Sequence, residues 1–139
     1  MTQVQVRDIM TTSVACIGST EPLTNAACRM RDLDVGSLPV RGSGNVLQGV
    51  VTDRDIVVHG LAEGIDPARM TVGELVRRKA FTVAADANIE TAAHLMGQWR
   101  VRRLVVVSGR WVVGIVSEGD LVRALPESLA GALAEAVSA

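Results

Sequence analysis

The chain has 139 residues, and its 48% hydrophobic and 21% charged residues exclude an intrinsically disordered protein. The net charge of −1 and the scarcity of aromatic residues, with one Phe, two Trp and no Tyr, argue against nucleic acid as a partner. No apolar run is long enough to span a membrane and the first residues have no signal-peptide core. We therefore expect a cytoplasmic protein with no membrane partner.

The sequence contains an internal repeat, which fixes the architecture before any element is assigned. Residues 6–40 and 72–106 match at an offset of 66 positions, with Val6 on Val72. After the next loop the offset becomes 65, because that loop is one residue longer in the first copy. We therefore expect a first repeat at 6–63, a linker at 64–71, a second repeat at 72–125 and a C-terminal helix within 126–139.

The first repeat predicts the order β-α-β-β-α after a short lead-in helix. Apolar residues spaced three and four apart indicate a helix over 23–33, with Pro22 near its start. Short β-branched runs bounded by Gly and Ser predict the strands. The expected elements are the lead-in helix at 6–10, a strand at 14–17, the helix at 23–33, strands at 37–40 and 46–51 joined by the loop 41–45, and a closing helix at 53–63.

The second repeat predicts the same order and is followed by one more helix. Pro126 ends the closing helix, and the alanine-rich stretch 128–137 carries Leu129, Leu133 and Val137 on one expected face. A repeat of about 50 residues buries its sheet poorly alone, so we expect an α+β fold in which the repeats pack sheet to sheet about a pseudo-twofold axis. The expected elements are helices at 72–77, 89–99 and 118–125 and strands at 81–83, 104–107 and 111–116.

One seven-residue pattern occurs once in each repeat, at 49–55 and at 114–120. A glycine opens a β-branched run, Thr52 or Ser117 follows, and an aspartate comes three positions later. This pattern marks a strand passing into the N-terminus of a helix. Free N–H groups there bind phosphate, the hydroxyl donates to a phosphate oxygen, and the carboxylate accepts from both hydroxyls of a ribose. The alternative interpretation is that Thr52 with Asp55, and Ser117 with Asp120, are only capping boxes.

The repeat order and the doubled motif resemble a pair of CBS domains, also called a Bateman module. Val-Gly-Ser-Leu-Pro-Val at 35–40 and Gly-Val-Val-Thr-Asp-Arg-Asp-Ile at 49–56 carry the resemblance, which extends over residues 6–125. The resemblance implies a regulatory or sensor protein that binds an adenosine-containing ligand such as AMP, ADP, ATP, NAD or S-adenosylmethionine. It also implies that two chains pair into a flat homodimeric disc and that an effector protein reads the ligand state.

A ligand cleft is expected at each motif, where the motif meets the first strand of the other repeat. The resemblance, carried over position by position, builds one cleft from Asp120, Ser117 and Ile115 with Ala15, Val35 and Gly36, and the other from Asp55, Thr52 and Val50 with Phe81, Val101 and Arg102. Phe81 stands where the first repeat has Ala15, and it either stacks on a base or fills the pocket. Arg102 stands where the first repeat has Gly36, and it either grips a phosphate or obstructs entry. Arg54 and Arg102 are the residues expected to meet a polyphosphate.

The other chemistry-bearing residues indicate no second kind of site. Cys16 and Cys28 lack a CxxC spacing and a histidine pair, so we expect inert thiols and no metal. The sequence has no Walker-type loop and no paired nucleophile and base, so we expect no enzymatic activity and no required cofactor. The rival hypothesis is a ligand-free structural or protein-interaction dimer that retains the fold and uses both motifs only as helix caps.

Overall fold

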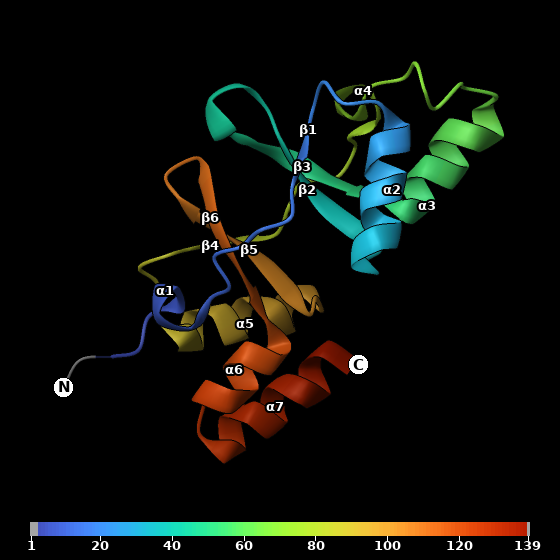
Figure 1. Cartoon of the computed structure of the whole chain (residues 1–139). Helices are drawn as coiled ribbons and strands as arrows, with labels where there is room; N and C mark the ends of the chain where they lie inside the picture. Colours follow the sequence, from blue (N-terminus) through green and yellow to red (C-terminus); the bar gives the residue numbers. More distant parts are fainter. Residues whose placement is uncertain (1–2, 139) are drawn as a thin grey trace. The chain divides into compact units, whose positions relative to one another are not determined.

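The computed structural model describes residues 3–138 and divides the chain into two compact units (Figure 1). The first-repeat unit is Ala15–Ala80, and the second-repeat unit runs up to Val14 and resumes at Phe81. The lead-in helices are therefore exchanged between the repeats. Helix α1 (Val6–Ile9) lies in the second-repeat unit, and helix α4 (Val72–Leu75) lies in the first-repeat unit.

Backbone hydrogen bonds hold each exchanged helix in its unit. Val6 N–H donates to the Ala87 carbonyl at 2.8 Å, whereas Val72 N–H donates to the Glu21 carbonyl at 2.8 Å. Val6 and Val72 are fully buried, so each anchors its helix in an apolar core as well. The boundaries of the compact units therefore differ from the boundaries of the sequence repeats.

The first-repeat unit contains a three-stranded sheet of order β1-β2-β3. Strand β1 is parallel to β2, and β2 is antiparallel to β3. The elements in chain order are β1 (Ile17–Gly18), α2 (Leu23–Leu33), β2 (Ser37–Arg41), the 3-10 turn η1 (Ser43–Asn45), β3 (Leu47–Thr52), α3 (Asp53–Asp55), the π-helical turn η2 (Ile56–Gly60), the 3-10 turn η3 (Leu61–Glu63) and α4.

The second-repeat unit has the same topology, with strand order β4-β5-β6, and adds one helix. A register shift between Val40 and Arg41 recurs between Val106 and Val107, the equivalent place 66 positions on. The two repeats therefore share even this irregularity in the pairing of their strands. The elements are α1, β4 (Thr82–Ala84), α5 (Ile89–Trp99), β5 (Arg103–Ser108), β6 (Trp111–Ser117), α6 (Glu118–Ala124) and α7 (Glu127–Ser138).

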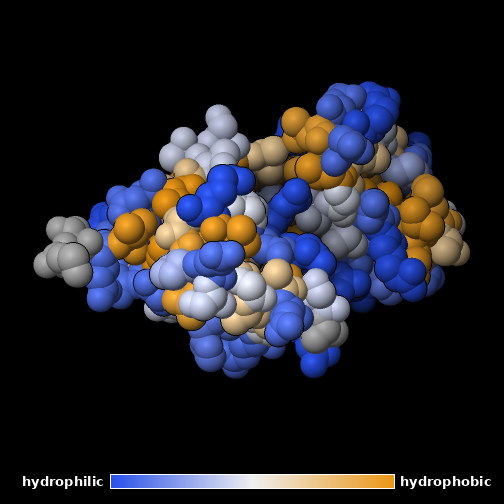
Figure 2. Space-filling view, turned by 90° about the horizontal axis from the view of Figure 1, so that it is seen from below, coloured by the Kyte–Doolittle hydropathy of each residue, from blue (hydrophilic) through white to orange (hydrophobic). Residues whose placement is uncertain are grey.

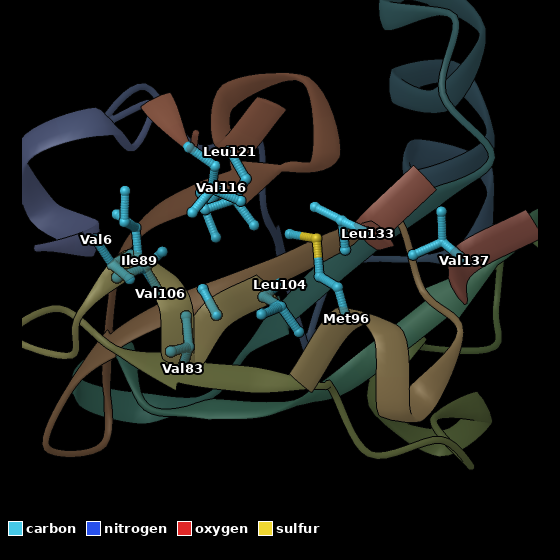
Figure 3. Close-up of a cluster of buried hydrophobic side chains, with 12 residues drawn as sticks. Val6, Val83, Ile89, Met96, Leu104, Val106, Val116, Leu121, Leu133 and Val137 are labelled. Atoms are coloured by element: carbon cyan, nitrogen blue, oxygen red, sulfur yellow. The ribbon is translucent and has the colours of Figure 1, made fainter. Parts of the chain in front are cut away.

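Helix α7 completes the core of the second-repeat unit. Figure 1 shows it beside α5 and α6, and Leu133 and Val137 join the buried cluster that contains Met96 (Figure 3). Gly97 permits the contact, because a Cβ there would lie 3.1 Å from the Cβ of Ala136. Within residues 15–80, all of which are described, the first-repeat unit has no helix equivalent to α7.

Several predicted boundaries need correction. Strand β1 does not begin at residue 14, because the Val14 N–H bonds locally to the Thr12 carbonyl and leaves the ladder. Leu129 is 45% exposed, whereas Leu133 and Val137 of the same predicted face are buried. Residues spaced by four advance roughly 40° per step around a helix, so Leu129 lies about 80° from Val137.

Some apolar side chains lie on the exposed surface. Figure 2 shows apolar residues in small groups among hydrophilic ones on one face of the molecule. In the first-repeat unit, Leu33, Val57 and Leu61 are exposed on the helical elements. Across residues 3–138, the helices are too short or too polar to cross a bilayer.

Candidate functional site

Both motifs lie where a strand passes into a helix, as the sequence predicts. Thr52 ends β3 and caps α3: its Oγ1 accepts from the Asp55 N–H at 3.0 Å, and its own N–H donates to Asp55 Oδ2 at 3.2 Å. Ser117 and Asp120 make the same reciprocal pair at 3.1 and 2.9 Å. A capping box is therefore present at both places. It does not exclude ligand binding, because each hydroxyl accepts in the cap and keeps its proton free to donate.

The glycine that opens each motif makes room for a neighbouring backbone. A Cβ on Gly49 would lie 2.4 Å from the carbonyl oxygen of Arg78, and the Val50 N–H donates to that same oxygen at 3.1 Å. A Cβ on Gly114 would lie 2.5 Å from Met10 Sδ, and the Ile115 N–H bonds to the Thr11 carbonyl at 2.9 Å. In each unit, the segment that follows the exchanged lead-in helix therefore lies against the motif strand.

The Asp55 carboxylate is buried and paired. Its side chain is 2% exposed, and both carboxylate oxygens lie 3.2 Å from Arg78 Nε. Burial works to raise the pKa of Asp55, but hydrogen bonds from Thr52 and Arg78 and the charge of Arg78 together hold that pKa below its ordinary value. Asp55 is thus a charged group whose acceptor positions are largely in use.

The Asp120 carboxylate has a more open setting. Its side chain is 16% exposed, and Oδ1 accepts from Arg123 Nη2 at 2.7 Å. Arg123 lies one turn further along the same helix and is 73% exposed, so this pair is a surface ion pair that water and salt weaken. A ligand can displace such a partner at small cost.

The loop residues predicted for the clefts lie beside the motif of their own unit. The Gly36 carbonyl accepts from the Asp53 N–H at 2.9 Å, and the Arg102 carbonyl accepts from the Glu118 N–H at 2.8 Å. The Arg102 side chain is also held, because its Nη1 lies 2.7 Å from Glu118 Oε2. Val35 and Val101 directly precede these loop residues and are half-buried.

The remaining predicted residues are spread over the two units. Val50, Thr52 and Arg54 lie with Asp55, and the Arg54 side chain is exposed. Ala15 is the first residue of the first-repeat unit, whereas Phe81 follows the break and lies in the second. The combination of each motif with residues of the other repeat stays a prediction.

Sequence analysis missed two residues that contact predicted site residues: Arg78, which contacts Asp55, and Trp99, which contacts Phe81. Arg78 belongs to the basic run at 77–79, a pattern typical of a solvated surface, and nothing in the sequence distinguishes it from its neighbours. Trp99 stacks against Phe81 with ring centroids 5.0 Å apart, and both rings are exposed. At the offset of 66, Phe81 and Trp99 correspond to Ala15 and Leu33, so the second repeat has aromatic residues at two positions where the first repeat has aliphatic ones. This difference was the signal in the sequence that could have indicated the aromatic pair.

The described residues offer no obvious metal centre. Across residues 3–138, His, Cys, Asp and Glu side chains nowhere gather in a group of three or more that could hold an ion. Both cysteines are free thiols, and burial raises the pKa of the Cys16 thiol although Arg41 and Arg29 oppose that effect.

Two proteins are similar in sequence over most of this chain. Hypoxic response protein 1 of Mycobacterium tuberculosis is 48% identical over 121 residues, which cover 87% of this chain and 85% of that protein. CBS domain-containing protein YhcV of Bacillus subtilis is 38% identical over 116 residues, covering 84% and 81%.

Two crystal structures are similar in fold and in sequence. Hypoxic Response Protein I with two coordinated zinc ions matches with a TM-score of 0.76 at 45% identity, over 88% of this chain and 100% of that chain. CBSX2 in complex with AMP matches with a TM-score of 0.71 at 28% identity, over 86% and 94%. The sequence model of the CBS domain matches twice, at residues 6–61 and 72–127, and the chain therefore belongs to the CBS domain family.

Proposed function

We propose that this chain is a sensor module that binds an adenosine-containing ligand, such as AMP, ADP, ATP, NAD or S-adenosylmethionine, next to its Gly-x-x-Thr/Ser-x-x-Asp motifs. The observation that carries the proposal is the junction at Ser117 and Asp120. There a hydroxyl with a free proton and a partly exposed carboxylate flank the first turn of a helix. These are the groups that a phosphate and a ribose diol require.

The ligand would occupy one or both of two clefts in this proposal. The principal cleft combines Asp120, Ser117 and Ile115 with Ala15, Val35 and Gly36, and the second combines Asp55, Thr52, Val50 and Arg54 with Phe81, Val101 and Arg102. The AMP complex of CBSX2, a relative at 28% identity, supports this ligand class. Binding would regulate a partner by favouring one conformation over another, in proportion to the difference in affinity between the two. We propose no enzymatic activity, and a homodimer as the working form.

Isothermal titration calorimetry of the full chain with AMP, ATP, NAD and S-adenosylmethionine tests the proposal. The wild type is expected to bind one of these ligands, and Asp120→Ala to weaken binding by roughly tenfold or more, since a hydrogen bond to a charged group is lost. Asp86→Ala is the matched control, because Asp86 is an exposed aspartate of the same unit outside the motif. Binding heat that Asp120→Ala leaves unchanged would remove the site assignment.

The ligand-free rival makes a different prediction for the same proteins. If the motifs are only caps, Asp120→Ala costs about 1 kcal/mol of unfolding free energy and none of the four ligands raises the melting temperature. Thermal unfolding with and without each ligand therefore separates the two functions.

A further inference from the structure

The two motif carboxylates differ in the side chain that reaches them from the segment lying against the motif strand. In the first-repeat unit that segment carries Arg78, whose Nε lies 3.2 Å from both oxygens of Asp55. In the second-repeat unit the equivalent segment carries Thr11 and Thr12, and the Asp120 carboxylate instead pairs with Arg123 of its own helix. The backbone contacts are similar but not identical: Val50 N–H donates to the Arg78 carbonyl, whereas Ile115 exchanges two hydrogen bonds with Thr11.

The acceptor positions of Asp55 are largely used. A carboxylate offers about four lone-pair positions on its two oxygens. Oδ2 accepts from the Thr52 N–H and from Arg78 Nε, and Oδ1 contacts Arg78 Nε as well. With 2% of the side chain exposed, no surface is left to which the two hydroxyls of a ribose could bind while Arg78 stays in place.

The Arg78 backbone is held against the motif strand, and its side chain, although 54% exposed, ends on the buried carboxylate of Asp55. The Arg78 carbonyl accepts from Val50 N–H at 3.1 Å, and the missing side chain of Gly49 allows this close approach. Displacing the guanidinium would leave the buried Asp55 charge without its cationic partner, which costs far more than breaking an exposed ion pair. The equivalent displacement of the 73% exposed Arg123 from Asp120 carries only the smaller cost.

We propose that the Arg78 guanidinium takes the place beside Asp55 that a ribose would need. Wild-type chains would therefore bind a nucleotide only at the Ser117–Asp120 motif. This inference rests on the proposed function, since it concerns which of the two motifs takes the ligand. Arg78 is then the residue that sets the stoichiometry of the module, and replacing its guanidinium by an uncharged chain of similar length opens the second site.

Calorimetry with AMP as the probe tests the inference on the full chain. The wild type is expected to bind one AMP per chain, and Arg78→Met to bind two, with the added site lost again in Arg78→Met combined with Asp55→Asn. Arg123→Met is the matched control, because it removes the partner of the other motif carboxylate, and it is expected to leave the stoichiometry at one. Thermal unfolding and circular dichroism of each variant establish that it is folded.

The other outcomes would overturn either the role of Arg78 or the proposed function. Two AMP molecules per wild-type chain, or an unchanged stoichiometry in a folded Arg78→Met, would overturn the role of Arg78 and leave the proposed function intact. If Arg78→Met does not fold, the wild-type stoichiometry and Arg78→Gln, which is uncharged but still polar, carry the test, with a second site again expected only in the variant. Absence of AMP binding to wild type and variants alike, with ATP, NAD and S-adenosylmethionine also inert, would overturn the proposed function itself.

Discussion

The two strand-to-helix junctions have the same local geometry and different surroundings. Thr52 with Asp55 and Ser117 with Asp120 make the same reciprocal cap. Asp55, however, is buried against Arg78, whereas Asp120 is partly exposed beside an arginine that lies in solvent. The comparison teaches that a motif fixes the backbone of its own turn, while access to its carboxylate depends on the segment that packs across it.

The units differ a second time at their helices. Helix α7 packs on α5 and α6 in the second-repeat unit, and its own Leu133 and Val137 are buried in the core cluster of that unit. Exposed apolar side chains remain on helical elements of both units: Leu33, Val57 and Leu61 in the first-repeat unit, and Val122 and Leu129 in the second. The duplicated scaffold therefore completes its core with an added helix in one copy only.

The largest expected effect tests whether α7 is an integral part of its unit. Leu133 is 4% exposed in the same cluster as Met96 and Leu104, so Leu133→Ala removes buried methyl groups and leaves a cavity (Figure 3). We expect a loss of about 2–5 kcal/mol in the free energy of unfolding, measured by urea denaturation. Leu129→Ala, at a 45% exposed position of the same helix, is expected to change it by less than about 0.5 kcal/mol.

Equal, small effects of the two leucine substitutions would contradict the comparison of the helices. They would mean that α7 contributes little to the core and that both units are equally uncovered. A large effect of Leu133→Ala alone keeps α7 as the element that distinguishes the second-repeat unit.

The motif glycines provide the next largest effect. A Cβ at Gly49 meets the Arg78 carbonyl at 2.4 Å and Val76 Cγ1 at 2.7 Å, so relief requires a shift of the backbone. At Gly114 the nearest atom is Met10 Sδ at 2.5 Å, the end of a flexible side chain, with the Thr11 carbonyl at 3.0 Å. We expect Gly49→Ala to cost about 2–3 kcal/mol and Gly114→Ala about 1 kcal/mol, compared by chemical denaturation. The reverse order would show that the segment carrying Arg78 yields more easily than the geometry indicates.

The sequence predicts much of this fold because the information is local and duplicated. The spacing of Leu23, Ala26 and Met30 sets the helix Leu23–Leu33, and the same spacing 66 residues later sets Ile89–Trp99; both helices are confirmed to the residue. The two caps follow from a hydroxyl and an aspartate three positions apart, and they are confirmed as well.

The features that sequence analysis missed depend on contacts between distant parts of the chain. The exchange of α1 and α4 cannot be read from periodicity, because the helices look alike whichever repeat they pack on. The pairing of Arg78 with Asp55 spans 23 positions, and only the three-dimensional path of the segment selects Arg78 over its neighbours Arg77 and Lys79.

The smallest expected effect concerns the pH dependence of stability at Asp55. Burial opposes ionisation there, but the hydrogen bonds from Thr52 and Arg78 and the charge of Arg78 prevail, so the pKa in the folded state lies below the unfolded value of about 3.9. The unfolded chain then binds this proton first as the pH falls, and the stabilisation present above that value is lost progressively as the pH drops through the folded pKa. Urea denaturation between about pH 5 and pH 3 should therefore show a shallower loss of unfolding free energy in Asp55→Asn than in the wild type. Asp86→Asn controls for the removal of one exposed carboxyl. Parallel curves for the wild type and Asp55→Asn would mean that the ion pair with Arg78 does not stabilise the charged form, and the contrast between the two motif carboxylates would lose its electrostatic basis.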